Sequence, residues 1–327
     1  MSLPTASRIA GATVVGLGEA LFDCFPDRSV LGGAPVNVAV HANALLSPSG
    51  GRALPATRVG ADELGDRFFA EMRRRGAPTD AVQRDQSLPT GRVAVEIDAG
   101  GDARYVFDQH SAWDAIVFDE PLARLAADCS AVAFGTLAQR AAASREAIHK
   151  FLSSAPQALR LLDVNLRQHY YSPETLDSSL RLASAVKLSE DEVNEVCELL
   201  DLTRPSRDIE AEAELLGTTY RLDWVAVTRG ARGASLFCDG EWHTGEQHAA
   251  RPKSNADTVG AGDSCCAALL CGFLAGMPID QTLSLANEVG AHVASVSGAT
   301  PPLPDTILTR FAQAAAKGES DPQPHTA

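Results

Sequence analysis

A run of small residues that turns directly into an apolar segment constrains this chain more than any other stretch. Residues 257–263 read DTVGAGD, and residues 264–271 read SCCAALLC, which is typical of a buried helix. Gly260-Ala261-Gly262 therefore lies where a helix starts. The first N–H groups of a helix lack partners within it and the helix dipole is positive there, so an anion can bind if no side chain blocks it.

Asp263 directly follows these small residues. A carboxylate beside a bound phosphate does not help to bind an anion, but it can accept a proton from an attacking hydroxyl group. Binding and catalysis would then meet in one short stretch. The alternative is that Asp263 is an ordinary acid of a first helical turn and that the glycines form only a tight turn.

Composition excludes several classes of partner. The 327 residues are 45% hydrophobic and 21% charged, enough for a large core, either as one big α/β domain or as a domain with an appendage. The net charge is −14, and Lys and Arg are scattered except at Arg73-Arg74-Arg75, so we expect neither nucleic acid nor a membrane as partner. Seven cysteines without a Cys-x-x-Cys pair and the lack of a targeting segment indicate reduced, buried thiols in a cytoplasmic protein.

Short apolar runs alternate with helical patterns from about residue 115 onwards, which predicts a parallel sheet with helices on both faces and ligands at the carboxyl ends of its strands. Asp163, Asn165 and Arg167 follow one such run. Arg167 could clamp a phosphate or orient a sugar, or it could form a surface salt bridge. Residues 91–98 and 103–108 flank a Gly-rich turn, which predicts a hairpin.

A second Gly-rich stretch lies near the N-terminus, where residues 32–40 read GGAPVNVAV. The two glycines allow the backbone to approach a ligand closely, and Pro35 favours a helix that starts near Val36. Asn37 in the first turn could bind a polyol or simply its own backbone. Asp23, at the end of the first apolar stretch, is either a ligand-facing acid or an acid of a solvent-facing loop.

Together, residues 32–39 and 257–263 resemble the two signatures of the ribokinase-like (PfkB-type) carbohydrate kinases. Residues 18–23 (GEALFD) and 165–167 (NLR) are most similar to the fructokinase branch of that family. The resemblance implies an α/β fold with a central, mostly parallel sheet, helices on both faces and a small β-sheet lid. The implied division is a core at 12–22, 32–87 and 112–316 and a lid at 23–31 and 88–111. Residues 317–327 are polar, with two prolines and no periodicity, which predicts a disordered tail.

The family implies an ATP-dependent sugar kinase whose substrate is fructose. The alternatives are a kinase of 2-keto-3-deoxygluconate or of another ketose or pentose, and a catalytically silent sugar or nucleotide sensor. Asp263 would be the catalytic base beside the Gly260-Ala261-Gly262 cradle. The implied sugar-binding residues are Asp23, Gly32, Gly33, Asn37 and Arg167, and the implied nucleotide-binding residues are Thr228, Gly230, Gly233 and Asn287.

The family also implies Mg²⁺, a monovalent cation such as K⁺ beside the cradle, and pairing of two copies through the lid. Glu192 matches the acid of a motif tied to Mg²⁺, acting through a metal-bound water. Ser189 stands where that motif has Asn, and it also fits a helix N-cap followed by acids of the first turn.

Overall fold

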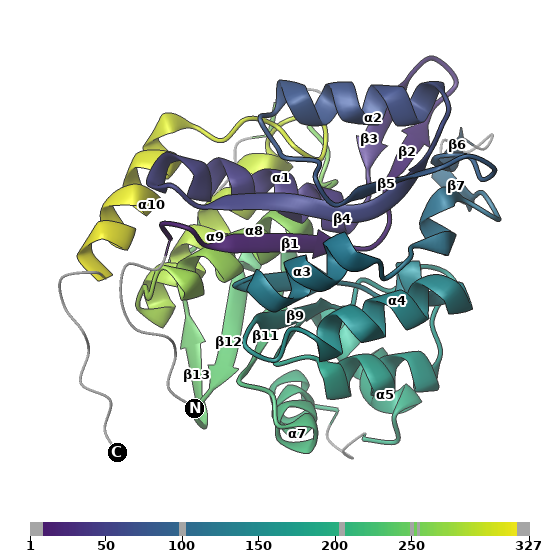
Figure 1. The fold of residues 1–327 in the computed structure, drawn as a ribbon. Helices are drawn as coiled ribbons and strands as arrows, with labels where there is room; N and C mark the ends of the chain where they lie inside the picture. The colour runs from purple at the N-terminus through teal and green to yellow at the C-terminus, as the bar shows by residue number, and fades with distance from the viewer. Residues whose placement is uncertain (1–8, 98–102, 203–206, 249–251, 254–255, 319–327) are drawn as a thin grey trace.

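The computed structural model describes residues 9–97, 103–202, 207–248, 252–253 and 256–318. Within them, one large and one small sheet form, and helices cover both faces of the large sheet (Figure 1). The large sheet has nine described strands, in the order β13 (Glu241–Thr244), β12 (Ala234–Cys238), β11 (Trp224–Thr228), β10 (Ala185–Ser189), β9 (Leu159–Asp163), β8 (Ala131–Phe134), β1 (Thr13–Leu17), β4 (Arg52–Gly60) and β5 (Val82–Asp85).

The central strands are apolar along their whole length. β1 reads TVVGL and β8 reads AVAF, and every residue of both is buried. Such strands are typical of parallel sheets covered on both faces. All neighbours from β5 to β11 pair in parallel, and only β12 and β13 join antiparallel. The predicted α/β fold with a mostly parallel sheet is therefore confirmed.

Two sets of helices bury the two faces of this sheet in separate hydrophobic cores. One face packs against α1 (Ala34–Leu46), α8 (Ala261–Leu274), α9 (Ile279–Ala294) and α10 (Asp305–Gly318). The other packs against α3 (Glu120–Asp128), α4 (Ala142–Ser153), α5 (Pro173–Leu182), α6 (Glu190–Leu199) and α7 (Ile209–Tyr220). Because α8 lies in the centre of its layer, all residues from Ser264 to Gly272 are buried, which explains its apolar sequence.

The small sheet corresponds to the predicted lid and lies at the right-hand end of the view in Figure 1. Its strand order is β3 (Ser29–Gly32), β2 (Leu21–Cys24), β6 (Gly91–Ile97) and β7 (Ala103–Phe107). β6 and β7 form the predicted antiparallel hairpin, whose turn at 98–102 lies outside the described residues. The lid begins two residues before the expected boundary at residue 23, since Leu21 already pairs with Gly32. α2 (Glu63–Arg74) packs behind it through Phe68 and Met72.

Further predictions concern the start of α1, the cysteines, the C-terminal tail and membrane association. α1 begins at Ala34, two residues before the expected start near Val36, so Pro35 is its second residue. All seven cysteines are free, and six of them are buried. Residues 319–327 of the tail lie outside the described residues, and α10 extends to Gly318. Among the described helices, none combines the length and the apolar character that a membrane span requires.

Candidate active site

The N-terminus of α8 is open, as the glycine pattern predicts. Gly260 precedes the helix with a φ of 79°, and no side chain caps it. A Cβ at Gly260 would lie 2.4 Å from the carbonyl oxygen of Ala299, so only glycine fits between the helix start and that loop. Within the described residues, the N–H groups of Gly262 and Asp263 have no hydrogen-bond partner. These amides can hold an anion.

Asp263 and Asn37 lie at opposite ends of the sequence but touch in the structure. The side-chain amide nitrogen of Asn37 donates to Oδ2 of Asp263 over 2.7 Å, because α1 and α8 pack side by side on one face of the sheet. Oδ1 of Asn37 is buried and has no partner among the described groups. Asn37 therefore orients the predicted base, and one of its polar atoms is left for a ligand.

The environment of Asp263 favours proton transfer near neutral pH. Burial, followed by the negative charge of Asp163, raises the pKa of Asp263 to about 6. The hydrogen bond from Asn37 and the positive charges of Lys187 and Arg167 act in the opposite direction. A carboxyl group with such a pKa is ionised at pH 7 but still able to take up a proton.

Two more carboxyl groups lie on the lid side of Asp263. Burial raises the pKa of Glu19 to about 7, and the nearby charge of Asp263 contributes to the rise. Burial also raises the pKa of Asp23, on β2, to about 6. The charge of Arg167 lowers the pKa of all three carboxyl groups, so its guanidinium acts on this space rather than only on a surface partner.

Close backbone packing requires Gly33 of the first motif, whereas a Cβ at Gly32 would meet side-chain atoms. A Cβ at Gly33, whose φ is 106°, would lie 2.5 Å from the carbonyl oxygen of Glu19. A Cβ at Gly32 would lie 2.9 Å from Oδ2 of Asp23. The predicted sugar-binding residues Asp23, Gly32, Gly33 and Asn37 thus come together between the lid and the cradle, with the charge of Arg167 acting on the same space.

Glu192 has a structural role that the motif alone does not reveal. Ser189 and Glu192 form a reciprocal capping box at the start of α6, as expected from the N-cap interpretation. Oε2 of Glu192 accepts from the backbone N–H of Ser189 over 2.8 Å, and Oε1 accepts from the N–H of Leu166 over 2.7 Å. Glu192 therefore ties the loop after β9 to α6. Its role toward Mg²⁺ through a water stays a prediction.

The predicted nucleotide-binding residues cluster after β11. Thr228 ends this strand, and Gly230 follows with a φ of 56° and open space around it. A Cβ at Gly233 would lie 2.9 Å from the amide nitrogen of Asn287. The side chain of Asn287 accepts from Ala234 N–H over 2.8 Å and donates to the carbonyl of Glu246 over 2.9 Å.

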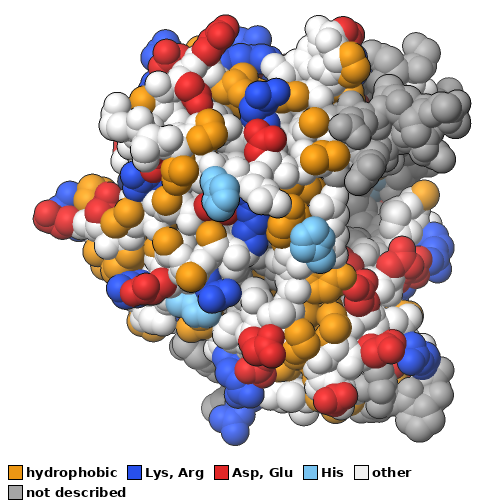
Figure 2. All heavy atoms as spheres, turned by 90° about the vertical axis from the view of Figure 1, so that its right-hand side faces the viewer, with side chains coloured by type: hydrophobic (Ala, Val, Ile, Leu, Met, Phe, Trp, Pro, Cys, Tyr) orange, Lys and Arg blue, Asp and Glu red, His pale blue; other side chains and the backbone are white. Residues whose placement is uncertain are grey.

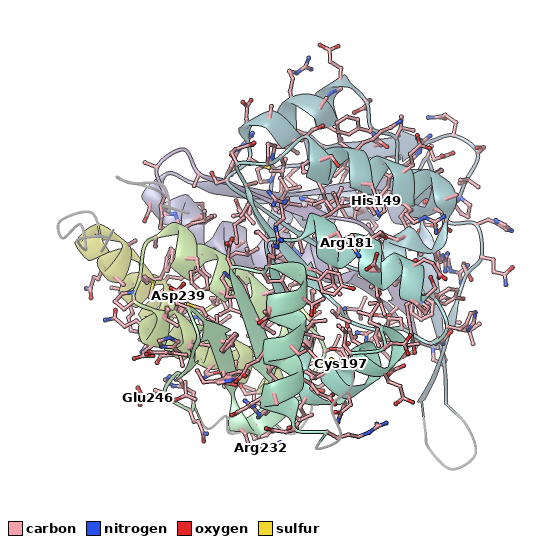
Figure 3. The ribbon with its side chains drawn as sticks, turned by 90° about the horizontal axis from the view of Figure 1, so that it is seen from below. His149, Arg181, Cys197, Arg232, Asp239 and Glu246 are labelled. Carbon is pink, nitrogen blue, oxygen red and sulfur yellow. The ribbon has the colours of Figure 1, made fainter. Side chains whose placement is uncertain are left out.

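Asn287 is an implied nucleotide-binding residue, and both polar atoms of its side-chain amide bond the backbone. A contribution to nucleotide binding would therefore come from the shape that it gives to the loop around Gly233. Figure 3 shows Arg232 and Glu246 of these loops toward the lower border of the view, whereas Asp239 of the β12–β13 turn lies further up.

Sequence reasoning missed two participants, Glu19 and Lys187. Glu19 is only 4% exposed, and its Oε2 has no partner among the described residues. Nζ of Lys187 bonds Oδ1 of Asp163 over 2.9 Å, and both side chains are buried. A single lysine within the apolar strand AVKLS was the available signal.

On the face that carries the lid, acidic, basic and hydrophobic side chains are interspersed (Figure 2). The described part of this face therefore shows no gathering of Lys and Arg such as a nucleic-acid surface would have. Residues 21–306 match the pfkB family carbohydrate kinase. The chain belongs to this family. It is a carbohydrate phosphotransferase, and its fold is that of the ribokinase-like kinases.

Known relatives agree with the fructokinase branch. The chain is 29% identical to a fructokinase of Salmonella typhimurium, over 90% of this chain and 96% of the relative. A fructokinase of Xylella fastidiosa, solved with bound ATP, superposes with a TM-score of 0.79 at 23% identity, over 92% of this chain and 98% of that one. A Vibrio cholerae fructokinase double mutant, solved with fructose, ADP and a potassium ion, gives a TM-score of 0.73 at 21% identity, over 94% and 99%.

Proposed function

We propose that this PfkB-family kinase phosphorylates fructose with ATP as the phosphoryl donor. One observation carries the proposal: the Asp263 carboxylate, held by Asn37 over 2.7 Å, lies directly at the open N-terminus of α8. A phosphoryl acceptor between the lid and this carboxylate would have its hydroxyl next to a base and its incoming phosphate next to the amides of Gly262 and Asp263. The fructokinases among its relatives support fructose as the acceptor.

In this mechanism the chain contributes a base, an anion site and a lid. Asp263 accepts the proton of the attacking hydroxyl, and the first amides of α8 stabilise the charge that develops on the transferred group. Asp23, Gly32 and Gly33 hold the sugar, with Arg167 and the free Oδ1 of Asn37 as further contacts. Closure of the lid would exclude water, which competes with the sugar for the phosphoryl group. Pairing of two copies through the lid remains part of the proposal.

The residues present fit ATP with Mg²⁺ carried by the phosphates. Both carboxylate oxygens of Glu192 already accept protein N–H groups, and the described residues hold no group of three or more side chains able to ligate a metal. Mg²⁺ often keeps several waters and binds through phosphates, and when bound it would neutralise their charge. Glu192 would then reach the ion only through water.

A K⁺ ion beside the cradle is also part of the proposal. Asp257 accepts from the backbone N–H of Gly298 over 3.0 Å, so its carboxylate joins the loop before α8 to the loop before α10. The potassium ion in the Vibrio cholerae fructokinase structure supports the proposal of a K⁺ site in this chain.

A panel of sugars tests the proposal. ADP release is measured with fructose, 2-keto-3-deoxygluconate, other ketoses and pentoses, each with and without K⁺. We expect the highest kcat/KM with fructose and a higher rate with K⁺. A higher kcat/KM with another sugar would replace fructose by that sugar. Binding of a sugar in calorimetry without any ADP release would establish the silent sensor instead.

The pH dependence tests the base. Because the pKa of Asp263 is raised to about 6, the carboxylate form predominates above that pH and is lost below it. The rate should therefore fall about tenfold per pH unit on the acid side of this pKa.

A further inference from the structure

A buried lysine lies against the first turn of α8 from the side of the sheet. Lys187 belongs to β10, and its side chain is 7% exposed. A Cβ placed on Gly262 would lie 3.2 Å from its Nζ. Gly262 therefore leaves room for two things, an anion approaching the helix N-terminus and an ammonium group behind it.

One neighbour of this ammonium group, the N-terminus of α8, is electrostatically unfavourable for a positive charge. Cations stabilise the C-terminus of a helix and anions its N-terminus, so a positive charge beside the first turn of α8 opposes the helix dipole. A buried ion pair also contributes little net stability, because the desolvation cost offsets the attraction. The start of α8 by itself thus gives no reason for a lysine at position 187.

Asp163 holds the lysine in place. Oδ1 of Asp163 accepts from Lys187 over 2.9 Å, and Oδ2 accepts from the thiol of Cys266 over 3.3 Å. Burial opposes the charge of Lys187, but the carboxylate of Asp163 holds its pKa well above the usual range. An ammonium group has three N–H donors, and among the described residues only Asp163 accepts one from Lys187. Two donors remain beside Gly262.

We propose that Lys187, fixed by Asp163, is a positioning residue for phosphoryl transfer. Its charge stands behind the Gly260-Ala261-Gly262 cradle, favours the arrival of anionic phosphates and keeps Asp263 ionised. The inference rests on the kinase activity proposed above.

Lys187 is one of several groups that act on the charge of Asp263. Those groups are Asn37 from α1, Asp163 from β9, Lys187 from β10, Arg167 from the loop after β9, and Glu19 from the segment after β1. Lys187 and Asp163 act in opposite directions, because the lysine lowers the pKa of Asp263 and the aspartate raises it.

This opposition gives a test with two variants. In Lys187→Met, the lysine no longer offsets the effect of Asp163 on the pKa of Asp263. The acid limb of the kcat profile should therefore move to higher pH by about one unit. In Lys187→Met with Asp163→Asn, both charges are gone, and the limb should return toward that of the wild-type enzyme. Maximal kcat should be about 10- to 100-fold lower in both variants, because the charge behind the cradle is missing in each.

Two more variants separate positioning from folding. Lys187→Arg keeps a positive charge and should restore part of the lost kcat. Arg140→Met breaks another buried ion pair, that of Arg140 with Asp114 at 2.8 Å, whose members do not act on the pKa of Asp263. It should lower thermal stability without moving the acid limb. If Lys187→Met does not fold because Asp163 is left unpaired, the double variant can still be measured, since it leaves no unpaired carboxylate.

Two results would overturn the proposal. One is an unchanged kcat and pH profile in Lys187→Met at a stability loss like that of Arg140→Met. The other is an acid limb that stays shifted in the double variant. If the wild-type enzyme turns over no sugar, the proposed function is wrong, but the role of Lys187 can still be tested. The test is then the affinity of each variant for a non-hydrolysable ATP analogue. A Kd about tenfold weaker in Lys187→Met but not in Arg140→Met supports the role, and an equal Kd refutes it.

Discussion

The helices α6 and α8 both begin at the ligand-facing edge of the sheet, but their N-termini are built in opposite ways. Ser189 caps α6, and Glu192 closes the box by accepting the N–H of Ser189. Gly260 precedes α8 without a side-chain cap, and the N–H groups of Gly262 and Asp263 have no partner among the described residues. One helix satisfies its own first turn, whereas the other leaves it for a ligand.

This difference shows how to separate a structural helix start from a binding one. At α6 the carboxylate of Glu192 already lies where an anion would bind. The residues that match the family's metal motif therefore cap the helix here, and Glu192 also accepts a hydrogen bond from Leu166. At α8 no carboxylate turns back to the helix start, since Asp263 bonds Asn37 instead. The open helix start is where we propose that phosphoryl transfer takes place, and the closed one holds the loop that carries Arg167.

The largest effect is expected from removing the proposed base at the open helix. Asp263→Asn should lower kcat by roughly 10²- to 10⁴-fold, because an amide cannot accept the proton. Affinities for sugar and nucleotide, measured by calorimetry, should stay near those of the wild-type enzyme. The first turn of α6 offers the control, since Asp191→Asn changes an acid there outside the capping box. Near-normal turnover of Asp263→Asn would contradict the assignment of Asp263 as the base.

A smaller effect is expected from filling the open N-terminus. Gly260→Ala needs a left-handed φ of 79° and brings a Cβ to 2.4 Å from Ala299 O. We expect a loss of about 1–3 kcal/mol in the free energy of unfolding and a weaker affinity for the nucleotide. Denaturant titration and calorimetry measure the two effects.

Gly240→Ala is the matched control, because its φ is 84° and nothing lies within 4 Å of the added Cβ. Gly240→Ala introduces a similar backbone strain in the β12–β13 turn but no steric clash of the added Cβ. If Gly260→Ala lost no more stability and affinity than this control, close packing at the cradle would not matter.

The smallest effect is expected at the closed helix. Ser189→Ala should cost about 1 kcal/mol of unfolding free energy and change kcat little, because only a cap is lost. Ser172→Ala provides the comparison, since Ser172 caps α5 in the same way, accepting from Thr175 N–H over 3.2 Å. Both variants are followed by thermal unfolding and by the Mg²⁺ concentration that gives half-maximal rate. A changed Mg²⁺ requirement in Ser189→Ala alone would assign the capping box a part in metal binding.

The sequence could predict the class of fold and the open start of α8 because these depend on local patterns. Buried parallel strands must be apolar on both sides, and a helix start that approaches a ligand must lack side chains. The alternation after residue 115 and the DTVGAGD stretch therefore needed no knowledge of distant contacts. The pairing of β6 with β7 was predictable for the same reason, since it joins neighbouring segments.

Those local patterns could not predict contacts between segments that are distant in the sequence. Asn37 is predicted to hold sugar, and only the structure shows that its amide nitrogen bonds Asp263, 226 residues away. Asn287 is predicted to bind nucleotide, and only the structure shows that its side chain bonds the backbone of Ala234 and Glu246. In each case the residue type was informative but the protein partner was not, because one amide side chain can serve a ligand, another side chain or the backbone.

The open glycine start of α8 and the acid that follows it were thus determined by the sequence alone, through the geometry of a helix N-terminus. Only the tertiary structure decided what surrounds Asp263. Packing of α1 beside α8 supplies Asn37, and the adjacency of β9 and β10 supplies Asp163 and Lys187. The proton affinity of a carboxyl group depends on its burial and on charges within a few ångströms, and those neighbours exist only once the sheet has formed.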